Sequence, residues 1–420
     1  MRGEVTQARR IRSRIVADLV QLTELLDALF RWAHMIAGIM WVGNSMLWNW
    51  MDRNLEHSAS DSRLSQGKIF MVHSGAFYDV EKKLLEPGHL PKTLHAFKWQ
   101  NGFTWMTGIC LLIVVYYFNH AALLVDPSIA NISPEVAITL SASALLTGWI
   151  VYDGLWRTIG DGNPRFTTAL SVVLLFGSIY AFAHVFSGRA AYIQTGVLMG
   201  TIMTGNVWFV ILPSQRALIA ATKSGAEQDP SLSLRAKQRS IHNNYFTFPL
   251  LFIMISNHIG AATNHHLNWL VLIAVMVGGS GVRHFMNTRY LGEGRQRPVG
   301  AWLAPAAVMG CVAVCGLFVI TRVGGAKAPP RAAGVVTFAR AQEIITRRCV
   351  PCHSEAPKLW ASAPQGIKFD RKETIQLMAS AIYEQAVRTN AMPLGNQTHI
   401  TEDERGELRT WIENGANFTP

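Results

Sequence analysis

The sequence element with the most specific chemistry is Cys349-Val-Pro-Cys352-His353, near the C-terminus. This C-x-x-C-H spacing is the attachment signature of a c-type haem, in which two thiols add to the haem vinyl groups and the next residue places an imidazole under the iron. A dithiol redox site would need both cysteines but not the adjacent histidine. We therefore expect one covalent haem c at Cys349 and Cys352, with His353 as an axial iron ligand.

The residues around this motif are typical of a small all-α class I cytochrome c domain. A helix is predicted over 337–348, and Met392 follows the motif just before a proline. Such a turn presents a thioether to iron, and a His–Met axial pair raises the reduction potential, which suits an electron acceptor. Thr401 is predicted to cap a closing helix that stops at Gly415. We expect Met392 to be the second ligand, whereas Met378, the alternative, lies in a helical pattern and is expected to pack.

Several ionisable side chains lie in or at the ends of apolar stretches, where they are costly and often functional. His34, His184 and His258 are candidates for holding a second haem (haem b) or a metal, and His34 begins a pattern that resembles the first span of membrane b-type haem proteins. The alternative for each is a hydrogen bond to a neighbouring helix. Asp153 is expected to pair with Arg157 one helical turn later.

Two polar clusters offer groups that suit a flat polar substrate. One includes His242, Asn244 and Tyr245, and the other includes His95 and Lys98. Imidazole and amide donors beside aromatic faces would bind such a ligand. Anchoring at the membrane–water interface explains part of both clusters as well.

The elements that must position these residues are predominantly membrane-spanning helices. The chain is 50% hydrophobic and only 15% charged, against a usual charged fraction of about 25%. A bilayer core about 30 Å thick needs roughly 20 apolar residues in a helix. Eight segments qualify or nearly so: 28–50, 103–119, 135–153, 166–187, 190–212, 245–263, 267–286 and 300–320. The net charge is +11, and the basic residues lie next to these apolar segments. This placement favours contact with anionic lipid over nucleic acid.

The distribution of Lys and Arg predicts the orientation in the membrane. Four loops (51–102, 154–165, 213–243 and 287–299) hold 17 of these residues, and the three opposite loops (120–134, 188–189 and 264–266) hold one. The positive-inside rule places the first set in the cytoplasm and both termini in the periplasm of a bacterial inner membrane. Bacteria attach haem c on that outer side, so the two expectations agree. The basic N-terminal segment disagrees, and a surface-lying helix or a misassigned start are the alternatives.

The membrane part shows a faint internal duplication. Gly38–Asn44 matches Gly200–Asn206, and Asn101–Trp105 matches Asn244–Phe248, in the same order. This predicts a parallel 4+4 repeat of helices, with chance similarity between Gly-rich spans as the alternative. The expected parts are a basic N-terminal segment (1–27), an all-α polytopic membrane domain (28–320), a Gly/Ala/Pro linker (321–336) and a cytochrome c domain (337–420).

Taken over residues 28–420, the chain resembles the membrane-bound urate hydroxylases, or PuuD-type urate oxidases, with a fused C-terminal cytochrome c. The resemblance is carried by 34–44, 88–99, 242–249, 256–258 and the C-x-x-C-H domain. It implies oxidation of urate to 5-hydroxyisourate in purine breakdown. It also implies that electrons leave through the fused haem to a terminal oxidase or a soluble cytochrome. The resemblance does not identify the catalytic residues.

Two other functions remain open from the sequence. The membrane domain could use quinol or haem b to reduce the cytochrome without purine chemistry. It could instead be a transporter or sensor whose cytochrome reports redox state, which a parallel repeat would suit. Reduction of the haem by urate, by quinol or by neither distinguishes the three.

Overall fold

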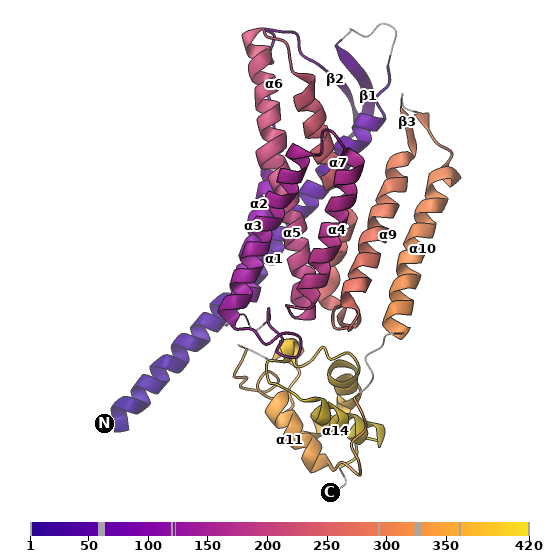
Figure 1. The fold of residues 1–420 in the computed structure, drawn as a ribbon. Helices are drawn as coiled ribbons and strands as arrows, with labels where there is room; N and C mark the ends of the chain where they lie inside the picture. The colour runs from indigo at the N-terminus through magenta and orange to yellow at the C-terminus, as the bar shows by residue number, and fades with distance from the viewer. Residues whose placement is uncertain are drawn as a thin grey trace.

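The computed structural model describes residues 2–57, 64–118, 121, 123–292, 295–323, 329–360 and 363–418. Long helices form a bundle, with the C-terminal region beyond one end of it (Figure 1). In chain order they are α1 (Arg2–Arg53), α2 (Trp99–Leu111) continued by the π-helical turn η1 (Leu112–Tyr117), α3 (Pro134–Thr158), α4 (Pro164–Ala183), α5 (Gly188–Gly205) continued through the π-helical turn η2 (Asn206–Ile211) into α6 (Leu212–Ser224), α7 (Pro230–Ile255), α9 (Asn268–Thr288) and α10 (Val299–Val323).

Among the described residues, six segments are long and apolar enough to cross a membrane: Gln21–Arg53, Pro134–Thr158, Pro164–Ala183, Gly188–Ser224, Asn268–Thr288 and Val299–Ile320. They match six of the eight predicted spans, so the chain is consistent with a multi-pass membrane protein. The other two predictions, 103–119 and 245–263, fall on α2–η1 and on α7 with the short turns after it. Helix α7 is less apolar because its first half carries Arg235, Lys237 and Arg239, and two asparagines follow them.

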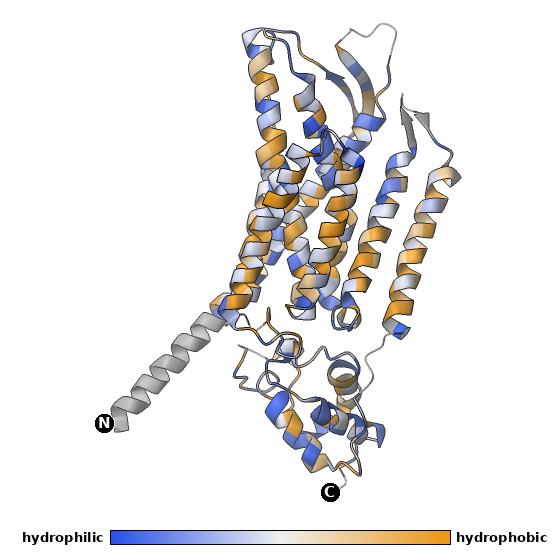
Figure 2. Ribbon diagram, viewed as in Figure 1, coloured by the Kyte–Doolittle hydropathy of each residue, from blue (hydrophilic) through white to orange (hydrophobic). Residues whose placement is uncertain are grey.

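The helices differ in how far they are enclosed. In the α5–α6 segment 61% of the apolar window is buried, against 6% in α10. Helix α5 is therefore central, and the apolar surface of α10 is left for lipid. Figure 2 shows hydrophobic residues along α3, α4, α9 and α10 and more hydrophilic residues in the C-terminal region.

Small residues allow close contacts around α5. A Cβ atom added to Gly205 would lie 2.5 Å from the ring of Trp149 on α3, and one added to Gly188 would lie 1.9 Å from the carbonyl oxygen of Thr263. Both distances are too short for any side chain. Glycine at these two positions therefore lets neighbouring backbone and rings approach, as small residues do between membrane helices.

The predicted loop 51–102 contains a β-hairpin, which the sequence analysis did not predict. Strands β1 (Ser65–His73) and β2 (Ala76–Lys83) pair in an antiparallel register. The two turn residues, Ser74 and Gly75, both have positive φ angles, 53° and 76°. Such a turn matches the twist of the strands. A second, very short pair joins β3 (Tyr290–Gly292) and β4 (Arg295–Gln296) between α9 and α10.

The C-terminal region has a hydrophobic core of its own, which includes Ile344, Ile345, Val387, Leu408 and Trp411. Its elements are α11 (Phe338–Arg348), η4 (Pro364–Gly366), α12 (Lys372–Leu377), α13 (Ala379–Ile382), η5 (Tyr383–Arg388), η6 (Leu394–Asn396) and α14 (Glu402–Glu413). The helix predicted over 337–348 is confirmed as α11.

The N-terminus of α14 follows the sequence prediction too. Thr401 accepts a hydrogen bond from the Glu404 backbone, and the Glu404 carboxylate accepts one from the Thr401 backbone, which forms a capping box. After the helix, Gly415 has a φ angle of +95°. A glycine in this left-handed conformation is a common helix stop.

Candidate functional site

The C-x-x-C-H motif directly continues helix α11. The backbone N–H of Cys349 donates to the Ile345 carbonyl at 2.7 Å, and that of His353 donates to the Cys349 carbonyl at 2.9 Å. The three side chains of the motif therefore lie within one helical turn, carried by a helix that packs in the core.

The imidazole of His353 is held through one nitrogen. Its Nδ1 lies 3.1 Å from the carbonyl oxygen of Ile367, so Nδ1–H donates to that backbone acceptor. The ring also packs against Phe369, with ring centroids 5.4 Å apart. A backbone acceptor on Nδ1 fixes the tautomer and leaves Nε2 with a lone pair, which is the usual arrangement for a metal-ligating histidine.

Burial sets the protonation of these groups. Burial raises the pKa of the Cys349 thiol to about 12 and also raises the pKa of the Cys352 thiol. A reactive redox dithiol needs the opposite shift, towards thiolate. Burial lowers the pKa of His353, which favours the neutral imidazole that ligates metals.

Met392 lies in the loop before α14 and is held through its backbone. Its N–H donates to the Gln385 carbonyl at 2.9 Å, and its carbonyl accepts from the buried guanidinium of Arg405, also at 2.9 Å. Arg405 donates to the Ala386 carbonyl as well and acts electrostatically on Cys349. Arg405 therefore anchors the methionine loop to η5, which contains Ala386. Met378, the alternative ligand, packs against the core.

These residues fit a covalent c-type haem. Two half-buried thiols lie at the attachment spacing, and the adjacent imidazole has its Nδ1 atom bonded to a carbonyl. A thioether lies in a loop that a buried arginine anchors. This is the donor set of a His–Met haem.

The three membrane histidines are not brought together. His34 of α1 bonds through Nδ1 to the Thr104 carbonyl of α2 at 2.9 Å. His184 bonds to the carbonyl of Tyr180 in its own helix at 2.8 Å. His258 is exposed at the end of the short turn η3 (Ser256–His258). Within the described parts of the chain, no group of three or more His, Cys, Asp and Glu side chains could hold a metal ion.

His242 belongs to a polar network between α3, η2 and α7. Its Nδ1 lies 2.7 Å from the Tyr152 hydroxyl, and its ring lies 4.2 Å from that of Trp156, centroid to centroid. Asn206 donates to the Tyr152 hydroxyl at 3.2 Å and to Asn243 Oδ1 at 2.9 Å. Asn206 is the first residue of a π-helical turn, a feature often found at functional positions.

An ion pair closes this network. Arg239, with 1% of its side chain exposed, lies 2.9 Å from Asp153, which also binds Arg157 at 2.6 Å as its spacing predicts. Sequence analysis found His242 and Asp153 but missed Tyr152, Arg239 and Asn206. The sequence contained part of the signal. His242 and Asn243 follow Arg239 by three and four residues, a spacing that places all three on one face of a helix.

The other predicted substrate residues lie elsewhere. Asn244 accepts hydrogen bonds from Arg283 and Asn287 of α9, both at 2.9 Å, and Tyr245 bonds to His284 of α9, also at 2.9 Å. They therefore face α9, away from the His242 network. His95 is exposed and Lys98 half-buried in the segment before α2, where Lys98 lies over the Trp99 ring. Asn244 and Tyr245 therefore do not form one site with His242, and neither do His95 and Lys98.

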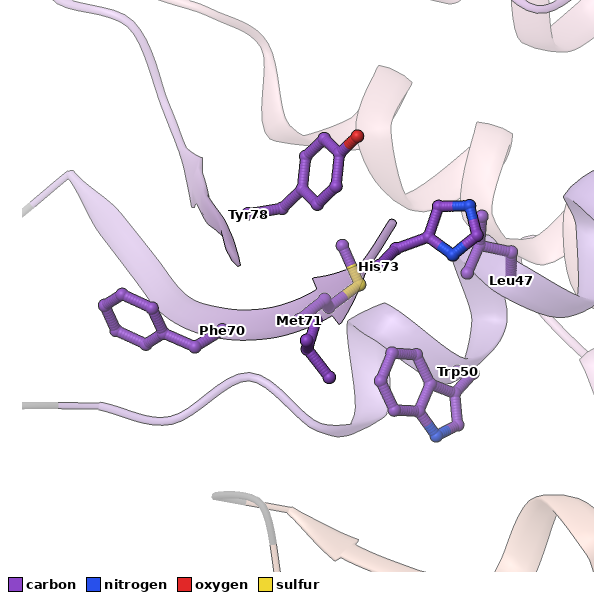
Figure 3. A pocket seen from close by; sticks show the side chains of 7 residues that line it. Leu47, Trp50, Phe70, Met71, His73 and Tyr78 are labelled. Carbon is purple, nitrogen blue, oxygen red and sulfur yellow. The ribbon is translucent and has the colours of Figure 1, made fainter. Parts of the chain in front are cut away.

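A cavity of about 560 Å³ lies between α1 and the hairpin, lined by Leu47, Trp50, Phe70, Met71, Val72, His73 and Tyr78. In Figure 3 Met71 lies between Tyr78 and Trp50, and Phe70 points away from the others. The lining is mostly apolar, with one imidazole and one phenol. This chemistry suits an apolar or aromatic occupant better than a charged one.

Comparison with known proteins adds the family. The model of the urate oxidase N-terminal family matches residues 20–318. No curated protein and no solved structure matches the chain. The matched range contains all the long helices of the bundle apart from the first residues of α1 and the last of α10, and the C-terminal region lies outside it. The chain therefore belongs to the urate oxidase N-terminal family.

Proposed function

We propose that the protein is a membrane-bound oxidoreductase that oxidises urate to 5-hydroxyisourate and delivers the electrons to a haem c in its own C-terminal region. The observation that carries the proposal is the fusion. A urate oxidase-family bundle over 20–318 is followed in the same chain by a folded C-x-x-C-H region. A covalent connection keeps the acceptor at high effective concentration near the donor.

The reaction balances without oxygen as a reactant. Urate and one water give 5-hydroxyisourate, two protons and two electrons. A c-type haem bound here supplies one-electron acceptance, so each urate requires two successive electron transfers. Cys349 and Cys352 would attach the group, and His353 and Met392 would ligate its iron. Arg405 holds the methionine loop, and a terminal oxidase or a soluble cytochrome would take the electrons onward.

The proposed topology has eight spans in a bacterial inner membrane. Helices α2–η1 and α7 would cross with the six apolar segments, since each packs lengthwise on a spanning neighbour: α2 on α1, and α7 on α9. The Lys- and Arg-rich loops lie at the end of the bundle that carries the hairpin, and the C-terminal region lies at the other end (Figure 1). This arrangement supports a periplasmic haem and a cytoplasmic hairpin.

The test uses the whole chain, produced in a host that matures c-type cytochromes. Limiting urate is added without oxygen, and the haem absorbance is followed. The expected result is two haems reduced for each urate consumed. The Cys349→Ser/Cys352→Ser double variant, which lacks attachment sites, is the control and should show no such absorbance. Urate consumption with a fully oxidised haem would contradict the proposal.

A second candidate function is quinol oxidation, favoured by the cavity between α1 and the hairpin. Its apolar wall with His73 and Tyr78 would accept an aromatic ring and hydrogen-bond its oxygens. The same experiment separates the two functions. A soluble quinol analogue that reduces the haem while urate does not would favour this second function.

A further inference from the structure

The methionine loop rests on the end of the helix bundle. Ala391, next to Met392, lies 3.4 Å from the Cβ position of Gly260, at the start of the short helix α8 (Gly260–Thr263). Arg405, which holds the Met392 carbonyl, interacts electrostatically with Asp126 in the loop before α3. One close contact and one electrostatic interaction therefore join the proposed haem-ligand loop to the bundle.

Three buried polar atoms at this junction lack a hydrogen-bond partner among the residues that the structure describes. They are Arg189 Nε, Asn264 Nδ2 and Asn390 Oδ1. Folded proteins leave few such atoms, because burying a polar group without a partner costs stability. Two donors and one acceptor in these segments are thus available to a ligand.

The three residues lie in segments that contact one another. Asn264 Nδ2 lies 3.6 Å from the Cβ position of Gly260, which in turn meets Ala391, the residue after Asn390. Gly188, the residue before Arg189, packs on the carbonyl of Thr263, the residue before Asn264. The segments that carry the three partnerless atoms, namely the first turn of α5, the segment after α8 and the methionine loop, therefore meet at one junction.

The surroundings of Arg189 favour an anion. No carboxylate pairs with its guanidinium in the described structure. Its charge acts on the buried Tyr116 hydroxyl, as do the charges of Arg31 and Asp27, which pair with each other. That hydroxyl donates to Asn257 Oδ1 at 3.4 Å. An arginine without a carboxylate partner, with amide and phenol groups nearby, suits a planar anion that carries both N–H donors and carbonyl acceptors.

We propose that this junction, formed by Arg189, Asn264 and Asn390, binds the urate anion beside the methionine loop. The inference rests on the proposed function and gives its substrate a location. Urate oxygens would accept from Arg189 and Asn264, and a ring N–H would donate to Asn390. Electrons lost by urate would then have a short path into the C-terminal region.

The other sites fit urate less well. In the network around His242 the side chains bond to one another, and only Arg239 Nε lacks a partner within the described residues. The cavity beside the hairpin is mostly apolar. This cavity also lies at the end of the bundle opposite the C-terminal region (Figure 1), so electrons from it would have to travel the length of the bundle.

Binding can be measured without turnover. The whole haem-loaded protein is reduced with dithionite, so that urate has no electron acceptor, and urate affinity is measured by calorimetry. Arg189→Met and Asn264→Leu should each weaken binding by about tenfold or more, as expected from the loss of one hydrogen bond to an anion. Arg189→Lys should retain part of the affinity. Arg165→Met, the same substitution at the exposed start of α4, is the matched control and should bind as the wild type does.

A labelling experiment gives a second readout if a variant folds poorly. Asn390→Cys should react with a maleimide, and urate should slow that reaction severalfold. An exposed Asp403→Cys in α14 should react at the same rate with and without urate. Wild-type affinity in Arg189→Met and Asn264→Leu, or labelling of Asn390→Cys that urate does not slow, would overturn the location. If urate reduces the wild-type haem in that case, the proposed function still stands.

Discussion

The Nδ1 atom of His353 donates to the backbone carbonyl of Ile367 across 3.1 Å. A carbonyl acceptor stays in place whatever side chain residue 367 carries. The ring orientation is therefore fixed by the fold of the segment between His353 and Phe369, whose N–H returns to the His353 carbonyl at 2.9 Å. The imidazole is thus positioned before any iron arrives.

The first prediction tests His353 as a ligand. His353→Ala should retain covalent haem, because both cysteines remain, but lose the low-spin spectrum of a six-coordinate iron. Added imidazole should restore it, since the vacated position is small. Haem-stained gels and absorption spectra measure the two properties. An unchanged spectrum before imidazole addition would show that another residue ligates the iron.

The second prediction tests Met392. Met392→Leu keeps the volume but removes the thioether, so the reduction potential should fall. Met378→Leu is the matched control, because Met378 packs against the core and should leave the potential unchanged. Redox titration of both variants decides between them. A reduction potential that falls only in Met378→Leu would identify Met378, and not Met392, as the axial ligand.

Sequence reasoning succeeded where the structure is set by neighbours in the chain. Helix α11, the Thr401 cap and the Asp153–Arg157 pair each depend on residues a few positions apart. The hairpin was missed because residues 51–102 were treated only as a charged loop. A Ser74-Gly75 turn between two strand-forming runs was the signal that could have found it.

The membrane clusters could not be assembled in the same way. His242, Asn244 and Tyr245 are near neighbours in sequence, but successive helical residues point about 100° apart. His242 therefore meets Tyr152 of α3, while Asn244 meets Arg283 of α9. Which face of α7 meets which helix depends on packing across the whole bundle, and no local pattern encodes that.

The third prediction concerns the Tyr152 hydroxyl, which bonds to both His242 and Asn206. Tyr152→Phe leaves two buried groups short of a partner and should destabilise the protein by about 1–3 kcal/mol. Tyr180→Phe is the control, because the described structure shows a ring contact to His184 but no hydrogen bond from the Tyr180 hydroxyl. Thermal unfolding in detergent measures both. Equal melting temperatures for the two variants would mean that the network contributes little.

The fourth prediction separates the two arginines that share Asp153. Asp153→Asn leaves the buried charge of Arg239 uncompensated, which should cost about 3–5 kcal/mol. Arg157→Gln removes the more exposed partner, whose side chain is 48% exposed, and should cost less than about 1 kcal/mol. Unfolding of the two variants is compared under the same conditions. A larger loss of unfolding free energy in Arg157→Gln than in Asp153→Asn would show that the buried Arg239 is not the partner that depends on Asp153.

The fifth prediction concerns acid stability and Glu404. Burial acts to raise the pKa of this carboxyl, but hydrogen bonds from Arg348, the Thr401 backbone and Arg347 outweigh it and leave the pKa below its usual value of 4.5. A carboxyl whose pKa is lower in the folded state stabilises the fold above pH 4.5, and that stabilisation is lost as the pH falls through the lowered pKa. Glu404→Gln should remove this part of the acid sensitivity and cost about 1–3 kcal/mol at neutral pH, since the hydrogen bonds from Arg347 and Arg348 weaken. Glu373→Gln, at an exposed position in α12, is the control. The effect is measured by monitoring unfolding of the C-terminal region through the haem spectrum between pH 2 and 7. Identical acid unfolding profiles for the wild type and Glu404→Gln would contradict this prediction.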